Sequence, residues 1–340
     1  MKVLVTGAAG FIGSHLAKRL AQENYSVTGV DNINDYYDVD LKYGRLSSIG
    51  FERNAVDAAG ENKCIHSSVF PGLCFARTDL HDTEHTASLF REGAFDIIVH
   101  LAAQAGVRYS LTNPHCYISA NIQGFLNVLE AARAYPPRHL VYASSSSVYG
   151  LNTKIPFSEN DDISRPASLY AATKRSNELM AHTYSHLYQI PATGLRFFTA
   201  YGPWGRPDMS PFIFTDAIVK GKTINVFNNG NMKRDFTFID DIVEGIIRVM
   251  RRIPDGDGVV PAAIYNIGAG KAVELMDFIH TLEDALGKKA RIQYAPMQPG
   301  DVCVTWADCS ALRRDTGFCP QTTLSDGIQQ FVAWYKYYYL

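Results

Sequence analysis

Residues 3–13 read VLVTGAAGFIG, and this stretch decides the fold. The apolar, β-branched run that ends at Gly7 is typical of a buried strand, and Gly13–Asn24 has the spacing of an amphipathic helix. Gly7, Gly10 and Gly13 let the backbone turn tightly and approach a pyrophosphate at the helix N-terminus. The stretch therefore predicts a strand, turn and helix that bind a dinucleotide, although a glycine turn that only packs helix on strand has the same pattern.

Further short β-branched runs alternate with longer amphipathic stretches, which is the pattern of a parallel sheet covered by helices. More strands are predicted at Ser26–Asp31, Leu73–Leu80, Phe95–Ala103, His139–Ser146 and Pro191–Phe198. From about Pro203 the alternation gives way to loops rich in Gly, Pro and Asn. The expected fold class is therefore α/β, a Rossmann-type doubly wound parallel sheet with a smaller C-terminal substrate-binding lobe. The polar stretch from Arg45 to Cys74, which lacks a clear period, predicts a surface insertion.

The composition excludes several classes of protein. The chain has 340 residues, 46% of them hydrophobic and 19% charged, and can bury a substantial core. Its net charge is −2 with scattered basic residues, so neither nucleic acid nor a membrane is an expected partner. No apolar run reaches the roughly 18 residues of a membrane span and no leader pattern precedes the first strand, so we expect a cytoplasmic protein. The six cysteines lack metal-ligand spacing, so we expect reduced thiols and no metal.

A carboxylate stands at the end of the second predicted strand. Asp31 follows Gly13 by 18 residues, where a carboxylate accepts hydrogen bonds from the adenosine ribose and repels a 2′-phosphate. NAD is therefore favoured over NADP, provided that Lys42 and Arg45 do not reach that ribose. Asp79, after the third predicted strand, either meets the adenine or caps a helix.

The second motif is Tyr170 with Lys174, four residues apart on a predicted helix. That spacing puts the phenol and the ammonium on one helix face. A phenol with a pKa of about 10 is a poor base at neutral pH, and a neighbouring cation favours its ionised form. The pair would supply a general base for an alcohol, although a solvated helix pair has the same spacing. The serine run 144–147 follows a parallel strand, where ligands of such sheets bind.

These motifs together resemble the extended short-chain dehydrogenase/reductases, in particular the sugar-nucleotide epimerases and dehydratases. The resemblance spans nearly the whole chain. It is carried by GAAGFIG (7–13), HLAAQAGVRYS (100–110), Asn121, SSSSVYG (144–150), Tyr170 with Lys174, RFFTAYGPWGRPDM (196–209) and KRDFTFIDD (233–241). The part GPWGRPDM is similar to the pattern of the UDP-glucuronate 4-epimerases.

The resemblance implies a reaction. UDP-glucuronate would be converted reversibly to UDP-galacturonate at carbon 4, through a transient 4-keto sugar and with tightly held NAD. Tyr170 would be the base on the 4-hydroxyl, Lys174 would hold the nicotinamide ribose and lower the tyrosine pKa, and Ser145 would be a hydroxyl partner of the substrate. Ser146-Ser147 replaces an acidic residue of the dehydratases and decarboxylases. Thr199 replaces an asparagine of the UDP-galactose 4-epimerases, which favours the uronic acid.

The resemblance also implies binding residues. For the cofactor they are Gly7, Gly10, Phe11, Ile12, Gly13, Asp31, Asn32, Asp79, Leu80, Ala102, Ala103, Gln104, Asn121, Tyr170 and Lys174. For the sugar carboxylate, which needs N–H and O–H donors, the candidates are Ser145, Ser146, Ser147, Thr199 and Arg206. Arg234 would contact the diphosphate and Asp301 the uridine ribose. The alternatives are an interlobe salt bridge for Arg206, a surface pair for Arg234 and a turn for Asp301.

The resemblance also implies two domains. Residues 1–190 would form the NAD-binding Rossmann domain, to which segments near 191–200 and 235–268 return. Residues 201–234 and 269–340 would form the UDP-sugar-binding lobe.

A homodimer is expected as well. In this family, helices like those predicted over Asn121–Ala134 and Leu169–Leu187 pair across a two-fold axis into a four-helix bundle. The chain's own lobe covering those faces is the alternative. Three other functions stay open: a 4-epimerase of UDP-galactose or another UDP-sugar, a UDP-glucuronate decarboxylase, and a non-catalytic NAD-sensing protein.

Overall fold

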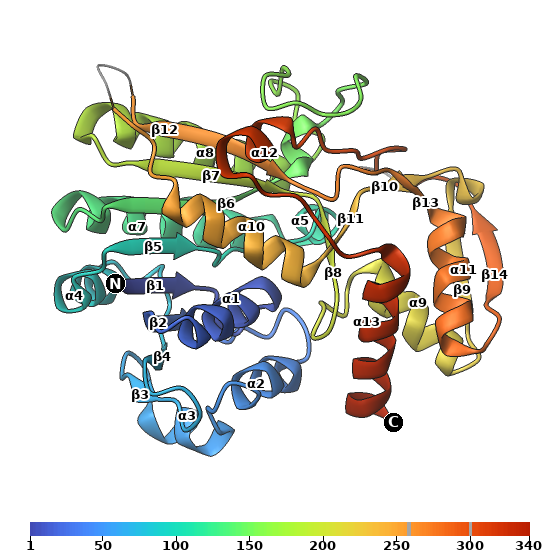
Figure 1. Cartoon of the computed structure of the whole chain (residues 1–340), viewed down its shortest axis with the longest axis horizontal. Coiled ribbons are helices and arrows are strands. Elements are labelled where there is room, and N and C mark those ends of the chain that lie inside the picture. The colour runs from blue at the N-terminus through green and yellow to red at the C-terminus, as the bar shows by residue number, and fades with distance from the viewer. Residues whose placement is uncertain (257–259, 299–300) are drawn as a thin grey trace.

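A mostly parallel sheet forms the centre of the chain, and a computed structural model describes residues 1–256, 260–298 and 301–340 (Figure 1). The strands of this sheet are β1 (Lys2–Thr6), β2 (Ser26–Asp31), β3 (Ile65–His66), β4 (Leu73–Arg77), β5 (Ile97–His100), β6 (His139–Ser145), β7 (Ala192–Phe197) and β12 (Ala262–Ile267). Their order is β12-β7-β6-β5-β1-β2-β4-β3, parallel throughout except for β3 against β4. This doubly wound order confirms the predicted fold class.

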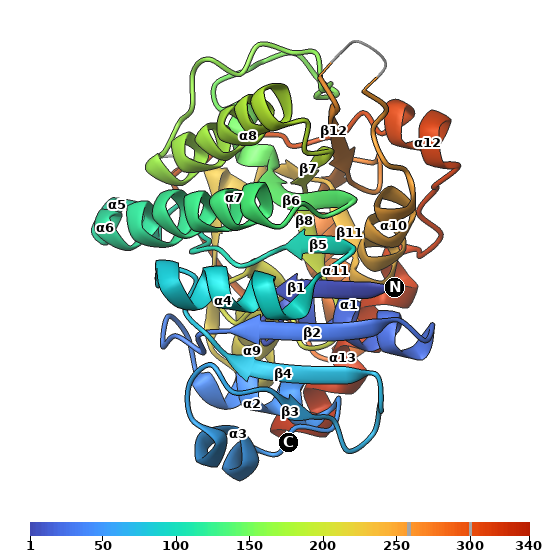
Figure 2. The ribbon, with the colours of Figure 1, turned by 90° about the vertical axis from the view of Figure 1, so that its left-hand side faces the viewer.

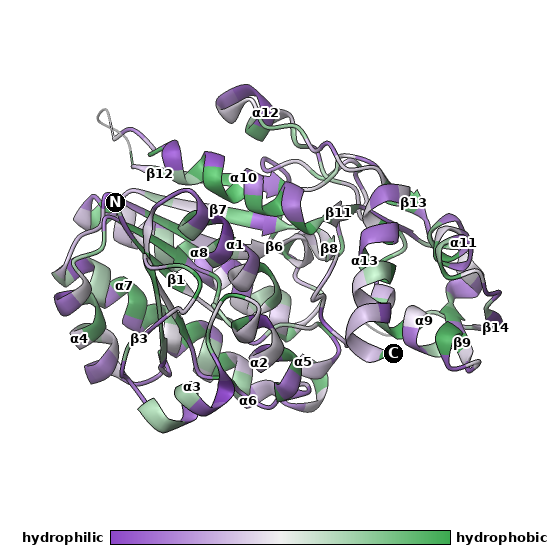
Figure 3. Cartoon of the chain, turned by 60° about the horizontal axis from the view of Figure 1, so that its bottom comes forward, coloured by the Kyte–Doolittle hydropathy of each residue, from purple (hydrophilic) through white to green (hydrophobic). Residues whose placement is uncertain are grey.

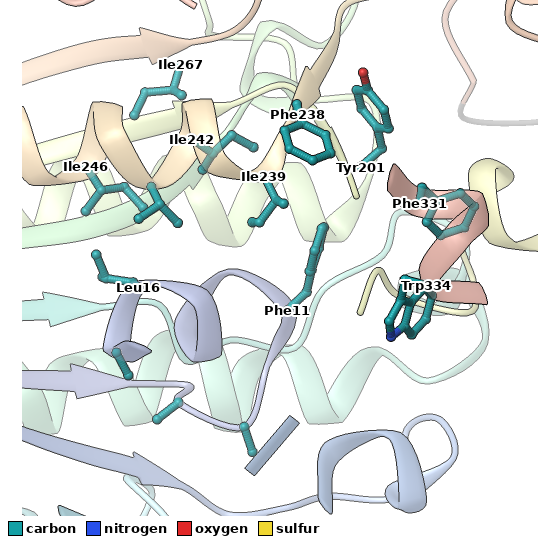
Figure 4. Packing of buried hydrophobic residues seen from close by; sticks show 14 of the residues in the cluster. Phe11, Leu16, Tyr201, Phe238, Ile239, Ile242, Ile246, Ile267, Phe331 and Trp334 are labelled. Atoms are coloured by element: carbon teal, nitrogen blue, oxygen red, sulfur yellow. The ribbon is translucent and has the colours of Figure 1, made fainter. Parts of the chain in front are cut away.

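Helices cover both faces of the sheet (Figure 2). One face carries α1 (Phe11–Gln22) and α10 (Ile239–Arg251), and the other carries α4 (Thr83–Gly93), α7 (Gly124–Ala134) and α8 (Leu169–Tyr188). Both colours alternate along α10 in Figure 3, as an amphipathic helix requires. The buried residues of α10 include Ile239, Ile242 and Ile246, at spacings of three and four. Figure 4 shows Ile246 above Leu16 of α1, so these two helices share one core.

A smaller group of elements lies beyond the carboxyl ends of the strands (Figure 1). It contains α9 (Ser210–Val219), β9 (Thr223–Phe227), α11 (Leu275–Leu286) and β14 (Arg291–Ala295). β14 pairs in parallel with β9, and α13 (Leu324–Tyr339) packs against α11. Two further strand pairs connect this group to the sheet: β8 (Thr199–Tyr201) with β11 (Phe236–Phe238), and β10 (Lys233–Arg234) with β13 (Val273–Glu274). The short helices are α5 (Tyr109–Thr112), α6 (Pro114–Tyr117), η2 (Ser146–Tyr149), η3 (Asn228–Gly230) and α12 (Ser310–Thr316).

The predicted insertion between Arg45 and Cys74 is more ordered than we expected. It contains the end of α2 (Val39–Ser47), then α3 (Arg53–Ala59) and β3. The Phe51 side chain is buried, with its ring centre 5.7 Å from that of Phe75 in β4. The apolar residues of this segment are too irregularly spaced to give a period, which is why the sequence indicated only a surface loop.

Element boundaries differ in detail from the predicted ones. The first helix begins at Phe11, two residues earlier than predicted, because Gly10 is the N-cap residue and its carbonyl oxygen already accepts from Ser14 N at 3.1 Å. The helix predicted from Asn121 is divided into a π-helix, η1 (Ile118–Gln123), and α7. In the described ranges, no helix has the length and apolar character needed to cross a membrane.

Candidate functional site

A cavity of about 1080 Å³ opens at the carboxyl ends of the parallel strands, next to the smaller group of elements. Ligands of doubly wound sheets bind at this edge. The cavity is lined by Gly7, Gly10, Phe11, Ile12, Gly13, Asp31, Asn32, Asp79, Leu80, Ala102, Ala103, Gln104, Ser145, Ser146, Ser147, Tyr170, Lys174, Thr199, Arg206, Arg234 and Asp301. The structure thus brings together every predicted site residue except Asn121.

The glycine turn has the shape of a pyrophosphate cradle. Gly7 has φ +74°, and a Cβ added there would lie 2.9 Å from the backbone nitrogen of Ala102. A Cβ on Gly13 would collide with the Gly7 carbonyl oxygen. No side chain caps the start of α1, so its first N–H groups and the positive end of its dipole are available to an anion. The turn therefore fits a dinucleotide.

Asp31 lies at the end of β2 with both oxygens engaged by backbone. It accepts hydrogen bonds from the nitrogens of Ala9 (3.1 Å) and Ile33 (2.8 Å). Lys42 Nζ lies 4.0 Å from Asp31 Oδ1, whereas Arg45 is turned away and donates to the carbonyl oxygen of Ala9 at 3.1 Å. Of the two cations that could weaken the preference for NAD, only Lys42 lies within ion-pair distance of Asp31.

Asp79 lies across from Asn32 at the same end of the cavity. Its Oδ2 accepts from the Asn32 amide at 3.2 Å, and its Oδ1 accepts from the backbone of His81 at 2.9 Å. The helix that follows, α4, is capped by Asp82, which accepts from His85 N at 3.0 Å. The helix-cap interpretation of Asp79 is therefore wrong, and its carboxylate faces the cavity.

Asn121 has a different role from the cofactor contact that we predicted. Its side chain is buried and does not line the cavity. Its Oδ1 accepts from Gln104 N at 2.8 Å, and its Nδ2 donates to Gln104 O at 3.0 Å and to Thr173 Oγ1 at 3.1 Å. Because the side chain points from η1 into the interior, Asn121 holds the cavity-lining Gln104 segment against α8.

Tyr170, Lys174 and Ser145 meet at the middle of the cavity. Ser168 caps α8 by accepting from Ala171 N at 3.1 Å, which fixes the start of the helix that carries Tyr170 and Lys174. Lys174 Nζ donates to the carbonyl oxygen of Ala143 at 3.0 Å. The Tyr170 and Ser145 side chains both line the cavity, and Ser145 Oγ accepts a hydrogen bond from the backbone nitrogen of Ser147 at 3.1 Å.

Burial shifts the pKa values of both Tyr170 and Lys174. Burial raises the pKa of Tyr170, and the Ser145 hydroxyl and the charge of Arg206 only partly offset this effect. Burial also lowers the pKa of Lys174 to about 8. Arg206 is the cation whose charge favours the Tyr170 phenolate in this structure, and the expected effect of Lys174 on the tyrosine pKa stays a prediction.

Arg206 and Asp208 form an ion pair at the cavity wall. The guanidinium donates from Nε to Oδ1 at 3.0 Å and from Nη2 to Oδ2 at 2.5 Å, and Tyr36 donates its hydroxyl to Oδ2 at 2.9 Å. Tyr36 and Asp208 were not predicted, since a tyrosine in a loop and an aspartate in a Pro-Asp pair carry no signal of their own.

The far end of the cavity carries Arg234 and Asp301. Arg234 Nη1 donates to the carbonyl oxygens of Lys233 (2.9 Å) and Cys303 (3.1 Å), so the surface pair with Asp235 is not formed. Burial lowers the pKa of Arg234, with Asp301 acting in the opposite direction. Asp301 accepts from Arg108 Nη2 at 2.9 Å. Arg108 is a further cation of the site that sequence reasoning missed.

Metal ligands are not grouped in this cavity or elsewhere in residues 1–256, 260–298 and 301–340, where no cluster of three His, Cys, Asp or Glu side chains suits a metal ion. The cavity instead contains the glycine cradle, the buried Tyr170 with Lys174, and three arginines, Arg108, Arg206 and Arg234. Such a site suits proton and hydride transfer on an anionic, phosphate-bearing molecule.

Comparisons with known proteins agree with this geometry. Residues 3–268 match the model of the NAD dependent epimerase/dehydratase family. A probable UDP-glucuronate 4-epimerase of Rhizobium meliloti is 45% identical, with 100% of this chain and 98% of that protein covered. UDP-glucuronate 4-epimerase 4 of Arabidopsis thaliana is 44% identical, covering 99% of this chain and 76% of the other.

A solved structure is similar over its full length. The UDP-glucuronic acid 4-epimerase of Bacillus cereus, in complex with UDP-glucuronic acid and NAD, superposes with a TM-score of 0.87. Its sequence is 32% identical, and the match covers 100% of both chains. The family model covers more than half of the chain, and the relatives match it from end to end. The chain therefore belongs to the NAD dependent epimerase/dehydratase family.

Proposed function

We propose that this protein interconverts UDP-glucuronate and UDP-galacturonate by epimerisation at carbon 4, with NAD as its cofactor. The observation that carries the proposal is the meeting of Tyr170, Ser145 and Arg206 in the cavity that also contains the glycine cradle. The names of the relatives, and the ligands named for the Bacillus cereus structure, support the same substrate.

Each side chain has its own role in the proposed reaction. Tyr170 takes the proton of the 4-hydroxyl, and Ser145 fixes that hydroxyl by hydrogen bonding. The glycine cradle and Asp31 would hold NAD, which would supply the removal and return of hydride at carbon 4. Arg206, with Ser146, Ser147 and Thr199, holds the sugar carboxylate. Arg234 contacts the diphosphate and Asp301 the uridine ribose.

The carboxylate makes the chemistry demanding. The 4-keto sugar is a β-keto acid, which loses carbon dioxide if the bond between carbons 5 and 6 breaks and carbon 5 takes a proton. A site that holds the carboxylate in the ring plane and offers no acid near carbon 5 avoids that loss. Ser146 and Ser147, in place of an acidic residue, fit this requirement.

Proton NMR of UDP-glucuronate with the purified protein, with and without added NAD⁺, tests the proposal. We expect UDP-galacturonate to accumulate to a constant ratio, with no pentose signal. Release of a 4-keto pentose would make the protein a decarboxylase instead, and turnover of UDP-glucose but not UDP-glucuronate would overturn the roles of Arg206 and Thr199.

We also propose the expected division into two domains, with residues 201–234 and 269–340 as the UDP-sugar lobe. The place of β12 in the main sheet supports the return of the segment 235–268 to the first domain. A cytoplasmic location stays a prediction.

A homodimer through α7 and α8 is proposed on the exposed leucines of α8. Leu179 and Leu187 are 53% and 59% exposed, which is unusual for two large apolar side chains on one helix. Size-exclusion chromatography of Leu179→Glu beside the wild type would show a shift from dimer to monomer. A wild-type protein that elutes as a monomer would remove the proposal.

A further inference from the structure

The guanidinium of Arg206 donates hydrogen bonds to the protein from only one of its edges, the edge formed by Nε and Nη2. Asp208 takes Nε and one hydrogen of Nη2, which is the side-on arrangement. An arginine has five N–H donors in a rigid fork, so the end formed by Nη1 and the second hydrogen of Nη2 can still bind another carboxylate with two hydrogen bonds. Within the ranges that the structure describes, Nη1 of Arg206 makes no hydrogen bond to the protein.

Asp208 is itself held from a distant part of the chain. The Tyr36 hydroxyl, in the loop after β2, donates to Asp208 Oδ2 at 2.9 Å. The Tyr36 ring packs against Tyr109, with ring centres 4.7 Å apart. Gly106, with φ +105°, leaves room for this contact, because a Cβ there would lie 2.8 Å from the Tyr36 hydroxyl. Asp208 is therefore held by the Tyr36 hydroxyl as well as by Arg206, and the Tyr36 contact limits how far its carboxylate can turn.

The arrangement also sets the charge of the pair. Burial alone would raise the pKa of Asp208, but Arg206 and the Tyr36 hydroxyl outweigh burial and keep the pKa below its usual value. Asp208 is therefore ionised at neutral pH and offsets much of the Arg206 charge. Binding of a second carboxylate to Arg206 would then depend more on the orientation of the two free N–H groups than on the net charge of the pair.

Resting on the proposed function, we propose that Asp208 and Tyr36 are positioning residues that aim the free end of Arg206 at the carboxylate of the uronic acid. Both are needed for a fixed direction: Asp208 sets the plane of the guanidinium, and Tyr36 stops Asp208 from turning. A guanidinium aimed in this way would keep the sugar carboxylate in one orientation while carbon 4 is a ketone.

A double-mutant cycle separates this role from simple support of the loop. Asp208→Asn keeps the shape of the side chain but removes the charge and one acceptor, and Tyr36→Phe keeps the ring. We expect the KM for UDP-glucuronate to rise about tenfold in Asp208→Asn and about threefold in Tyr36→Phe. In both variants kcat should change less than KM, and a 4-keto pentose should be detected beside UDP-galacturonate.

Residues that act through Arg206 lose their effect once Arg206 is gone. In an Arg206→Met background we therefore expect neither substitution to raise KM further. Tyr43→Phe is the matched control, because it also removes a phenol–carboxylate hydrogen bond, to Asp57 at 2.5 Å, but outside the cavity lining. Its KM and products should equal those of the wild type. Thermal unfolding and bound NAD content confirm that each variant is folded.

The possible outcomes are distinct. A KM for Asp208→Asn that is unchanged or lower, or effects that add to that of Arg206→Met, would overturn the positioning role. Asp208 would then only offset the arginine charge or support the loop. A wild-type protein that leaves UDP-glucuronate unchanged would instead refute the proposed function, before any variant is compared.

Discussion

Arg196 and Glu178 form an ion pair in the protein interior, directly behind the site. Nε lies 2.8 Å from Oε1 and Nη2 lies 3.0 Å from Oε2, and both side chains are at most 3% exposed. Ser144 donates to Glu178 Oε1 at 2.6 Å. Glu178 is one helical turn beyond Lys174, so Arg196 in β7 and Ser144 in β6 both connect their strands to the helix that carries Tyr170.

Breaking this pair should destabilise the fold. We expect Glu178→Gln to lower the free energy of unfolding by about 3–5 kcal/mol, because Arg196 would keep a buried charge without its counter-ion. Chemical unfolding in urea measures the change. Glu244→Gln is the control, since it removes a partly exposed pair with Arg248 (2.7 Å) and should cost no more than about 1 kcal/mol. Equal losses in the two variants would contradict the importance of burial.

The tyrosine base gives the most direct test of the chemistry. Tyr170→Phe should lower kcat by about 10²- to 10⁴-fold, the usual contribution of a general base, and leave the bound NAD content unchanged. Tyr184→Phe lies on the same helix and loses only a hydrogen bond to Glu130, so its kcat should stay at the wild-type value. Wild-type turnover in Tyr170→Phe would rule out the proposed mechanism.

Asp31 should control the choice of cofactor. In Asp31→Asn the charge that repels a 2′-phosphate is lost while Lys42 remains close by. We expect the preference for NAD over NADP to fall about tenfold or more, which corresponds to a loss of about 1.4 kcal/mol of discrimination. Binding of each dinucleotide, followed by fluorescence, measures the ratio. No change in the ratio would mean that Asp31 does not face the ribose.

The pH dependence of stability should show the effect of Glu283 in α11. Burial would raise the pKa of Glu283, but Lys289, Ala290 N and His280 outweigh burial and lower the pKa to about 2. The ionised form is thus favoured by folding, so Glu283 stabilises the protein above its ordinary pKa of 4.5, and this contribution is lost as the pH falls towards 2. Glu283→Gln should unfold at lower urea concentration than the wild type at pH 7, and the difference should shrink below pH 4.5. A difference that is constant with pH would exclude a titrating origin.

The parts of the site that follow from local sequence were predictable. The glycine turn, Asp31 at the end of a strand, and Tyr170 with Lys174 each depend on a spacing within about one element. The lining of the cavity by Arg234 and Asp301 came from family resemblance and not from any period in the sequence.

The side-chain partners could not be predicted in the same way. Tyr36 and Asp208 are 172 positions apart, so only the path of the folded chain brings them together. Asn121 shows a related limit: the sequence predicted a cofactor contact, but whether its side chain faces the cavity or the interior depends on the π-helix that carries it.

The position of β12 at the edge of the main sheet has a consequence for synthesis. Residues 262–267 pair with β7 and are translated after α9, β9 and the loop that carries Arg206. A nascent chain that stops before residue 262 leaves β7 as an open edge, which is a site for aggregation. On the proposed domain division, the lobe segments 201–234 and 269–340 are separated by a segment that returns to the first domain, so an exchange of substrate lobes between relatives requires three crossover points rather than one.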